Sequence, residues 1–121
     1  MPIRSLIVDD NESFARAASV LLEREGMSVV GVALTGADAL RQVERLRPDV
    51  VLVDVFLGEE SGLKLAQRLT EDGSDATVIM ISTHAEADMM SLMQDSPAAG
   101  FLPKANLSAK EIRRILDGGR Q

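Results

Sequence analysis

Cysteine, tryptophan and tyrosine are absent from the sequence, and phenylalanine occurs only three times in 121 residues. The absence of cysteine excludes disulfides, thiolate metal sites and cysteine nucleophiles. Because aromatic side chains are so rare, we expect a core of aliphatic side chains and methionine. A single histidine, His84, supplies too few nitrogen ligands for a typical zinc site.

Long apolar runs are also missing. No stretch approaches the length of a transmembrane helix, and the N-terminus lacks the hydrophobic segment of a signal peptide. The net charge of −6 argues against a non-specific nucleic-acid binder, which needs a basic face to neutralise phosphates. We therefore expect one soluble, cytoplasmic domain that contacts neither nucleic acid nor membrane.

Short apolar runs alternate with helical patterns along the chain. The runs predict strands over residues 3–8, 27–34, 50–54, 77–81 and 99–102. A helical pattern follows each run, and the connections are short. Strict alternation of this kind implies a parallel sheet with right-handed crossovers and helices on both faces. The prediction is a doubly wound α/β domain with five parallel strands and five helices.

The helix patterns also predict where helices begin and end. Asp10 or Asn11 can cap the first helix, and Gly26 ends it. Ser108 and Glu111 form the pattern of a capping box at the start of the last helix. The face of the first helix that we expect to be buried carries Phe14, Ala17, Ala18, Leu21 and Leu22.

Reactive side chains gather where the predicted strands end. Parallel strands place their carboxyl ends at one edge of the sheet, where such folds bind their ligands. Asp9 and Asp10 follow the first strand, Asp54 closes the third, Ser82 follows the fourth and Lys104 follows the fifth. Two carboxylates roughly 5 Å apart repel by about 3 kcal/mol at an effective dielectric near 20. The cluster therefore needs a cation, either Lys104 or a divalent metal ion.

Oxygen ligands favour Mg²⁺ as that metal ion. Acids, a hydroxyl and a lysine without a histidine base are typical of phosphoryl chemistry. Asp54 would be the covalent acceptor, while the metal ion and Lys104 neutralise the charge on the phosphoryl oxygens. The alternative, that these acids are only helix caps and loop residues, is disfavoured because Ser82 and Lys104 are placed with them.

These residues, taken in order, resemble the receiver domain of two-component response regulators. The resemblance extends from Ile3 to about Leu116. It implies a flavodoxin-like sheet with strand order 2-1-3-4-5, a receiver domain over 1–117, and a tail or linker start over 118–121. The motifs that carry it are Leu6-Ile7-Val8-Asp9-Asp10, Asp54 to Gly62, Ile81-Ser82 and Gly100-Phe101-Leu102-Pro103-Lys104.

The resemblance implies that Asp54 accepts a phosphoryl group from a sensor histidine kinase or a phosphotransfer protein. Mg²⁺ would be bound by Asp10, Asp54 and the backbone carbonyl of Phe56, with Asp9 holding the ion through water. The chain would not be an ordinary enzyme. It would catalyse its own phosphorylation and lose the phosphoryl group slowly.

The resemblance also assigns a switch. Ser82, favoured over Thr83 by its spacing, would contact one phosphoryl oxygen and Lys104 another. Ser82 and Phe101 would then rearrange together and remodel the face formed by the fourth helix, the fifth strand and the fifth helix. That face would signal, most simply to a transcriptional output domain, or form a homodimer.

Two residues near the acceptor depart from the family pattern. Gly58 stands where the family usually has proline, so the loop after Asp54 should be less constrained. Ala105 also replaces a proline. It predicts either a trans peptide bond after Lys104 or a strained cis bond.

The fourth helix, expected near residues 86–95, carries further departures. Pro97 occupies a position usually held by glycine, and the helix should end early because proline cannot continue it. Met89, Met90 and Met93 cannot all face inward, so some of them could form an adaptable partner surface.

Phe56 and His84 flank the acceptor at positions that vary in the family. Their side chains influence how easily water reaches the acyl phosphate, and bulky Phe56 would slow self-dephosphorylation. We expect His84 to be a solvated loop residue, and likewise Glu59 and Glu60 in the loop over 56–60.

Other function classes fit less well. An aspartyl-phosphate hydrolase of the haloacid dehalogenase type needs a second aspartate two residues after the nucleophile, where Phe56 stands. A flavin mononucleotide carrier on the same fold needs phosphate loops and stacking aromatics that the sequence lacks. The alternative that stays open is a receiver-like module that binds partners without being phosphorylated.

Overall fold

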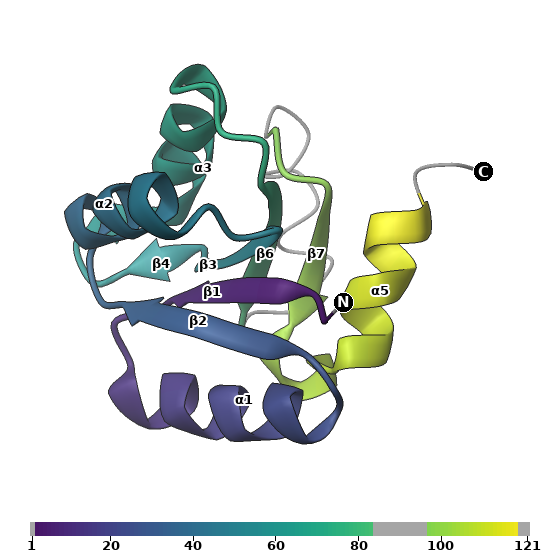
Figure 1. Cartoon of the computed structure of the whole chain (residues 1–121). Helices are drawn as coiled ribbons and strands as arrows, with labels where there is room; N and C mark the ends of the chain where they lie inside the picture. Colours follow the sequence, from purple (N-terminus) through teal and green to yellow (C-terminus); the bar gives the residue numbers. More distant parts are fainter. Residues whose placement is uncertain (1, 84–96, 119–121) are drawn as a thin grey trace.

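Five strands form one parallel sheet in the computed structural model, which describes residues 2–83 and 97–118 (Figure 1). Their order across the sheet is β2-β1-β3-β6-β7, which corresponds to the predicted order 2-1-3-4-5. Each strand lies within one residue of its predicted range. The strands are β1 (Arg4–Val8), β2 (Ser28–Ala33), β3 (Val50–Asp54), β6 (Thr77–Ser82) and β7 (Gly100–Pro103).

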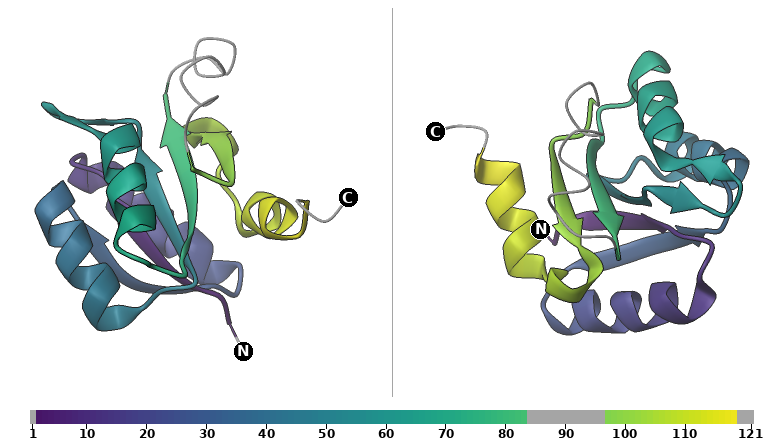
Figure 2. Two further views of the ribbon diagram at one scale, coloured as in Figure 1. Left: turned by 90° about the horizontal axis from the view of Figure 1, so that it is seen from above. Right: turned by 180° about the vertical axis from the view of Figure 1, so that it is seen from behind.

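Helices cover both faces of this sheet, with α2 and α3 on one face and α1 and α5 on the other (Figure 2). The predicted helix near 86–95, with His84 and the three methionines, lies outside the described residues. Among the described helices none is long and apolar enough to cross a membrane. The helices are α1 (Glu12–Arg24), α2 (Gly36–Leu46), α3 (Gly62–Glu71), α5 (Ala109–Gly118) and the short 3₁₀ helix η1 (Lys104–Asn106).

The central strand β3 is buried along its whole length. Val51 and Val53 pack toward α2 and α3, while Val50 and Leu52 pack toward α1 and α5. Alternate side chains point to opposite faces of a strand, so an uninterrupted apolar run is what a strand between two helical layers requires. The prediction of a strand buried on both faces is confirmed, and Asp54 closes it.

The first helix turns a different face to the sheet than its spacing predicts. Ala15, Ala18 and Leu22 are buried, whereas Ala17 is exposed and Leu21 is 38% exposed. The prediction that Ala17 and Leu21 face inward is therefore wrong. The two small alanines let α1 lie close to the sheet, which leaves the neighbouring flank in solvent.

A small hairpin replaces the loop predicted after Asp54. Residues Phe56–Leu57 (β4) pair antiparallel with Glu60–Ser61 (β5). Gly58 lies in the turn at φ +61°, a left-handed conformation that glycine adopts without a steric penalty. A proline ring holds φ near −65°, so the residue usual in the family could not form this turn. Glycine in place of the family's usual proline at position 58 therefore allows the hairpin to form.

The start of α5 is anchored to the end of α1. Ser108 Oγ accepts a hydrogen bond from the Glu111 amide (3.1 Å), the first half of the predicted capping box. In a full capping box the Glu111 carboxylate would accept a hydrogen bond from the Ser108 amide. Here the carboxylate accepts from the Arg114 side chain. The Ala109 amide donates instead to Glu25 Oε1 at 2.7 Å, across 84 residues of sequence. A carboxylate at a helix N-terminus stabilises the unpaired amides and the positive end of the helix dipole.

We predict that Glu25→Ala lowers the free energy of unfolding by about 1 kcal/mol, the usual cost of removing an N-terminal cap. Glu25→Gln should cost less, because it keeps an acceptor oxygen and loses only the charge. Urea unfolding followed by circular dichroism measures both. The control is Glu23→Ala, at an exposed position of the same helix. Equal effects at residues 23 and 25 would contradict the role of the cap.

Candidate functional site

Three carboxylates meet at the carboxyl edge of the sheet. Asp9 and Asp10 follow β1 and Asp54 ends β3, and these two strands are neighbours with Val8 paired to Val53. One oxygen from each acid lies within 4.8 Å of the others. The structure therefore brings together the three acids that the sequence places at strand ends.

Asp9 is the innermost of these acids and is fully buried. Its Oδ1 accepts a hydrogen bond from the Asn11 amide at 2.9 Å. Its Oδ2 lies 2.6 Å from Nζ of Lys104, an ionic contact without a well-aligned hydrogen bond. Asp10, by contrast, is exposed to solvent. The two adjacent acids thus have different environments, with Asp9 paired to the lysine.

Asp54 is held from two sides and is only 8% exposed. Its Oδ1 accepts a hydrogen bond from the Phe56 amide at 3.2 Å, and its Oδ2 lies 3.3 Å from Nζ of Lys104. Behind it, a Cβ atom on Gly62 would lie 1.9 Å from the Asp54 carbonyl oxygen. Only glycine fits there, which explains why the segment from Asp54 ends in glycine where α3 begins.

Lys104 reaches the acids from the end of β7. The peptide bond to Ala105 is trans, the first of the two predicted alternatives. The side chain is 11% exposed, and its ammonium lies 4.3 Å from the centre of the Phe14 ring. Two carboxylates and one aromatic ring therefore surround the cation. The sequence predicts the acids but not Phe14, whose pattern indicates only a core position on α1.

The pKa values follow from this enclosure. Burial raises the pKa of Asp54, and the negative charge of Asp9 raises it further, while the Phe56 amide and Lys104 oppose the shift. Burial alone would lower the pKa of Lys104, but the close contacts with the negatively charged Asp9 and Asp54 outweigh it, so the pKa is raised. The lysine therefore stays charged at neutral pH.

The ligand set of this site fits a hard divalent cation. Three carboxylates face one ammonium, so negative charge is in excess. The buried Oδ2 of Asp9 lacks a well-aligned hydrogen bond. Carboxylate and carbonyl oxygens, without cysteine or clustered histidine, are ligands that suit Mg²⁺.

Ser82 and Phe101, the predicted switch pair, lie on adjacent strands. Ser82 ends β6 and is 1% exposed, one residue beyond the partner of Asp54 in the sheet register. Phe101 lies on β7 opposite Met80 and is partly buried against the core under α2 and α3. The serine therefore lies at the same edge of the sheet as the acids, and the phenylalanine lies further back along the neighbouring strand.

Glu60 has a role that the sequence does not predict. Its Oε1 accepts a hydrogen bond from the Gly36 amide (3.1 Å) at the start of α2. Glu60 is exposed to solvent, as predicted, but this hydrogen bond is an additional contact. A contact across 24 residues leaves no local pattern, so nothing in the sequence signals it. It ties the hairpin beside Asp54 to the N-terminus of α2.

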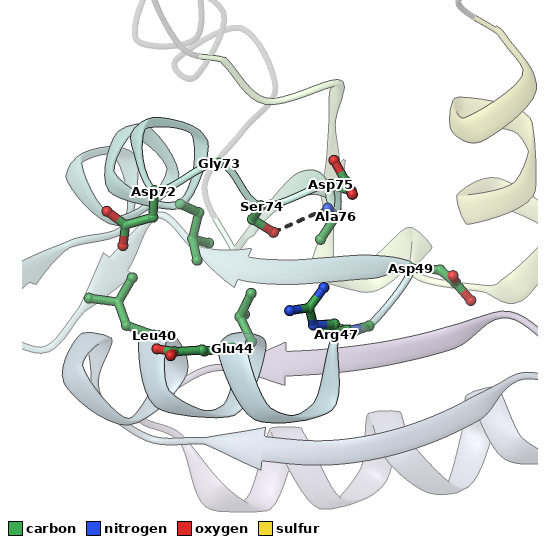
Figure 3. A pocket seen from close by; sticks show the side chains of 12 residues that line it. Leu40, Glu44, Arg47, Asp49, Asp72, Gly73, Ser74, Asp75 and Ala76 are labelled. Atoms are coloured by element: carbon green, nitrogen blue, oxygen red, sulfur yellow. Dashed lines mark hydrogen bonds between the residues drawn. The ribbon is translucent and has the colours of Figure 1, made fainter.

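A separate pocket of about 640 Å³ lies at the opposite edge of the sheet, between the last turns of α2 and α3 (Figure 3). Arg47 lies among acids there, and the Ser74 hydroxyl accepts a hydrogen bond from the Ala76 amide. Asp49 precedes β3, whereas Asp54 ends it, so this pocket is separated from the three carboxylates by the length of the strand.

Comparisons with known proteins agree with the fold. The model of the response regulator receiver domain family matches residues 5–117. The chain is 33% identical over 122 residues to the uncharacterised transcriptional regulatory protein YvfU of Bacillus subtilis, covering 98% of this chain and 61% of that protein. It is 32% identical over 122 residues to the response regulator GacA of Pseudomonas aeruginosa, with coverage of 98% and 57%. The chain thus spans less than two thirds of either relative.

The three-dimensional structure is also similar to that of a known response regulator. It is similar to the crystal structure of a response regulator from Thermotoga maritima, with a TM-score of 0.81 and 26% sequence identity. The similarity covers 97% of this chain and 99% of that one. The arrangement of sheet and helices therefore follows a known architecture.

We predict that Asp54→Asn is more stable than the wild type at neutral pH. Because the pKa of Asp54 is raised in the folded protein, folding disfavours its ionised form. That cost is absent below the unfolded pKa of aspartate, about 3.9. The cost grows as the pH rises from that value to the pKa of Asp54 in the folded protein, and above that pKa it is constant. Unfolding in urea, measured with EDTA from acidic to neutral pH, tests this.

The stability difference between Asp54→Asn and wild type should shrink as the pH falls toward 3.9, the approximate unfolded value. Asp75→Asn, on an exposed residue at the opposite edge, is the matched control. A difference that is independent of pH, or that grows toward acid, would contradict the raised pKa.

Proposed function

The chain belongs to the family of response regulator receiver domains, and we propose that it is a phosphoacceptor of two-component signalling in the cytoplasm. Asp54 takes a phosphoryl group from the phosphohistidine of a sensor histidine kinase or a phosphotransfer protein. The observation that carries this proposal is the position of the Asp54 carboxylate. It ends the central strand with one oxygen beside the Lys104 ammonium and with two further acids within reach.

Asp10, Asp54 and the backbone carbonyl of Phe56 would hold Mg²⁺ directly, and Asp9 would hold it through water. When bound, the ion neutralises charge between the carboxylates and the incoming phosphoryl oxygens. The excess of carboxylates over the single ammonium supports this assignment.

The chain's own residues orient the reaction. The Phe56 amide holds one oxygen of Asp54, which fixes the plane of the carboxylate. A carboxylate oxygen forms the bond to phosphorus while the bond from phosphorus to the donor nitrogen breaks. Lys104, already next to Asp54, pairs with a phosphoryl oxygen as charge develops on it. The buried hydroxyl of Ser82 contacts another phosphoryl oxygen.

Signalling follows from the switch pair. Ser82 moves toward the phosphoryl group and Phe101 reorients on β7, so phosphorylation favours one of two arrangements of the face around β7 and α5. That face passes the signal to a transcriptional output domain or forms a homodimer. The name of the relative YvfU, a transcriptional regulatory protein, supports a transcriptional output. The receiver domain covers 1–117 in this proposal, although α5 extends one residue further, to Gly118, so the predicted boundary before residue 118 falls inside the helix.

We predict Mg²⁺-dependent phosphorylation of the purified chain by acetyl phosphate. Intact-mass spectrometry should show the addition of one phosphoryl group to the wild type. Asp54→Asn should show none, because it lacks the nucleophilic carboxylate, and EDTA should abolish the addition to the wild type. Asp75→Asn, distant from the site, should be phosphorylated like the wild type.

Phosphorylation that persists in Asp54→Asn would contradict the acceptor assignment. An unmodified wild type that also fails to bind beryllofluoride with Mg²⁺ would favour the alternative, a receiver-like module that works without phosphorylation.

Phe56 should protect the acyl phosphate from water. Its side chain is 47% exposed at the rim of the site. Phe56→Asn replaces the ring by a smaller amide that can bind water, and we expect the half-life of the phosphorylated form to fall roughly tenfold, or about 1.4 kcal/mol in barrier. Phe56→Leu keeps an apolar side chain and should retain most of the lifetime. An unchanged half-life in Phe56→Asn would remove the shielding role.

A further inference from the structure

The ring of Phe14 lies against the ammonium of the catalytic lysine. Nζ of Lys104 is 4.3 Å from the ring centre, well inside the range of a cation–π contact. The same ammonium lies 2.6 Å from Asp9 and 3.3 Å from Asp54. The lysine side chain is 11% exposed, so little water remains around the charge. Three groups therefore define where the ammonium lies, and one of them is an aromatic ring on α1.

Hydrogen bonds order the backbone between the acid Asp9 and the residue that carries this ring. Asp9 Oδ1 accepts from the Asn11 amide at 2.9 Å, and the Asn11 side chain accepts from the Phe14 amide at 3.0 Å. The second bond is also the N-terminal cap of α1. One short, hydrogen-bonded segment thus carries both the innermost acid and the ring, and both contact Lys104.

We propose that Phe14 is a positioning residue for Lys104, which holds the ammonium where it reaches both Asp9 and Asp54. A lysine side chain has a flexible four-carbon stem, so its head group needs contacts to define its position. The ring attracts the cation and keeps water from its third side. Without the ring, the ammonium would settle on its closer partner Asp9 and lose Asp54.

The consequence for phosphoryl transfer rests on the proposed function. An ammonium kept near Asp54 is already placed to pair with a phosphoryl oxygen, so no rearrangement is needed during the reaction. The competing explanation is that Phe14 only fills space, because its ring also packs against the core under α1 and α5. The two explanations differ in whether the effect of Phe14 depends on the charge of Lys104.

A double-mutant cycle tests that dependence without any phosphorylation. Urea unfolding in EDTA compares the wild type, Phe14→Leu, Lys104→Met and the double variant. Leucine keeps an apolar side chain but has no ring face. Phe14→Leu should raise the unfolding equilibrium constant several-fold more in the presence of the lysine than in the Lys104→Met background. Additive effects would overturn the proposal.

A spectroscopic measurement locates the contact directly. Protons of the Lys104 ε-methylene group above an aromatic ring should resonate upfield in the NMR spectrum. The shift should disappear in Phe14→Leu and persist in Phe14→Tyr, which keeps the ring. Equal shifts in the wild type and Phe14→Leu would overturn the proposal.

The kinetic test uses acetyl phosphate and Mg²⁺. Phe14→Leu should be phosphorylated roughly tenfold more slowly, as expected for a lost cation–π contact, and Phe14→Tyr should recover most of the rate. Leu22→Val, at a buried position of the same helix, controls for destabilisation of α1 and should keep the wild-type rate.

The kinetic outcomes separate the two proposals. If the wild type is phosphorylated on Asp54 and Phe14→Leu matches its rate, the positioning role is wrong and the proposed function stands. If the wild type is never phosphorylated, the proposed function fails. The double-mutant cycle then decides the role of Phe14 alone.

Discussion

The ammonium of Lys104 is the charge on which the acidic edge of the sheet depends. It contacts Asp9 and Asp54, both almost fully withdrawn from water. Two buried carboxylates this close would repel strongly without a cation beside them. One group comes from each of β1, β3 and β7, so the sheet brings the charges together.

Backbone geometry after Asp54 completes the site. Gly62 allows the chain to pass directly against the Asp54 carbonyl, and Gly58 allows the β4–β5 hairpin to turn tightly. Glu60 then joins this hairpin to the N-terminus of α2. The segment that carries the Phe56 amide and carbonyl is therefore braced at both ends. The hairpin beside Asp54 is thereby connected to the start of α2.

The acids and the lysine were predictable because they obey a rule of topology. Side chains that follow parallel strands must meet at one edge, so positions such as Asp54 and Lys104 can be placed from strand ends alone. Phe14, Glu25 and Glu60 obey no such rule. Each makes its contact with a residue far along the chain. From the local sequence, Phe14 is a core position, Glu25 a helix end and Glu60 a loop residue. The inward face of α1 was mispredicted for a related reason, because spacing alone does not distinguish Leu21 from Ala15.

The sequence by itself determined the order of strands and helices, the burial of β3, and the set of oxygen ligands and one lysine at the strand ends. These follow from the spacing of apolar residues and the geometry of parallel sheets, which act locally and repeat. Only the tertiary structure decided that Asp9 is the buried acid and Asp10 the exposed one. It also decided that a ring from α1 lies over Lys104. Both depend on how closely α1 and the end of β7 approach the same point, and that distance is set by packing across the whole domain.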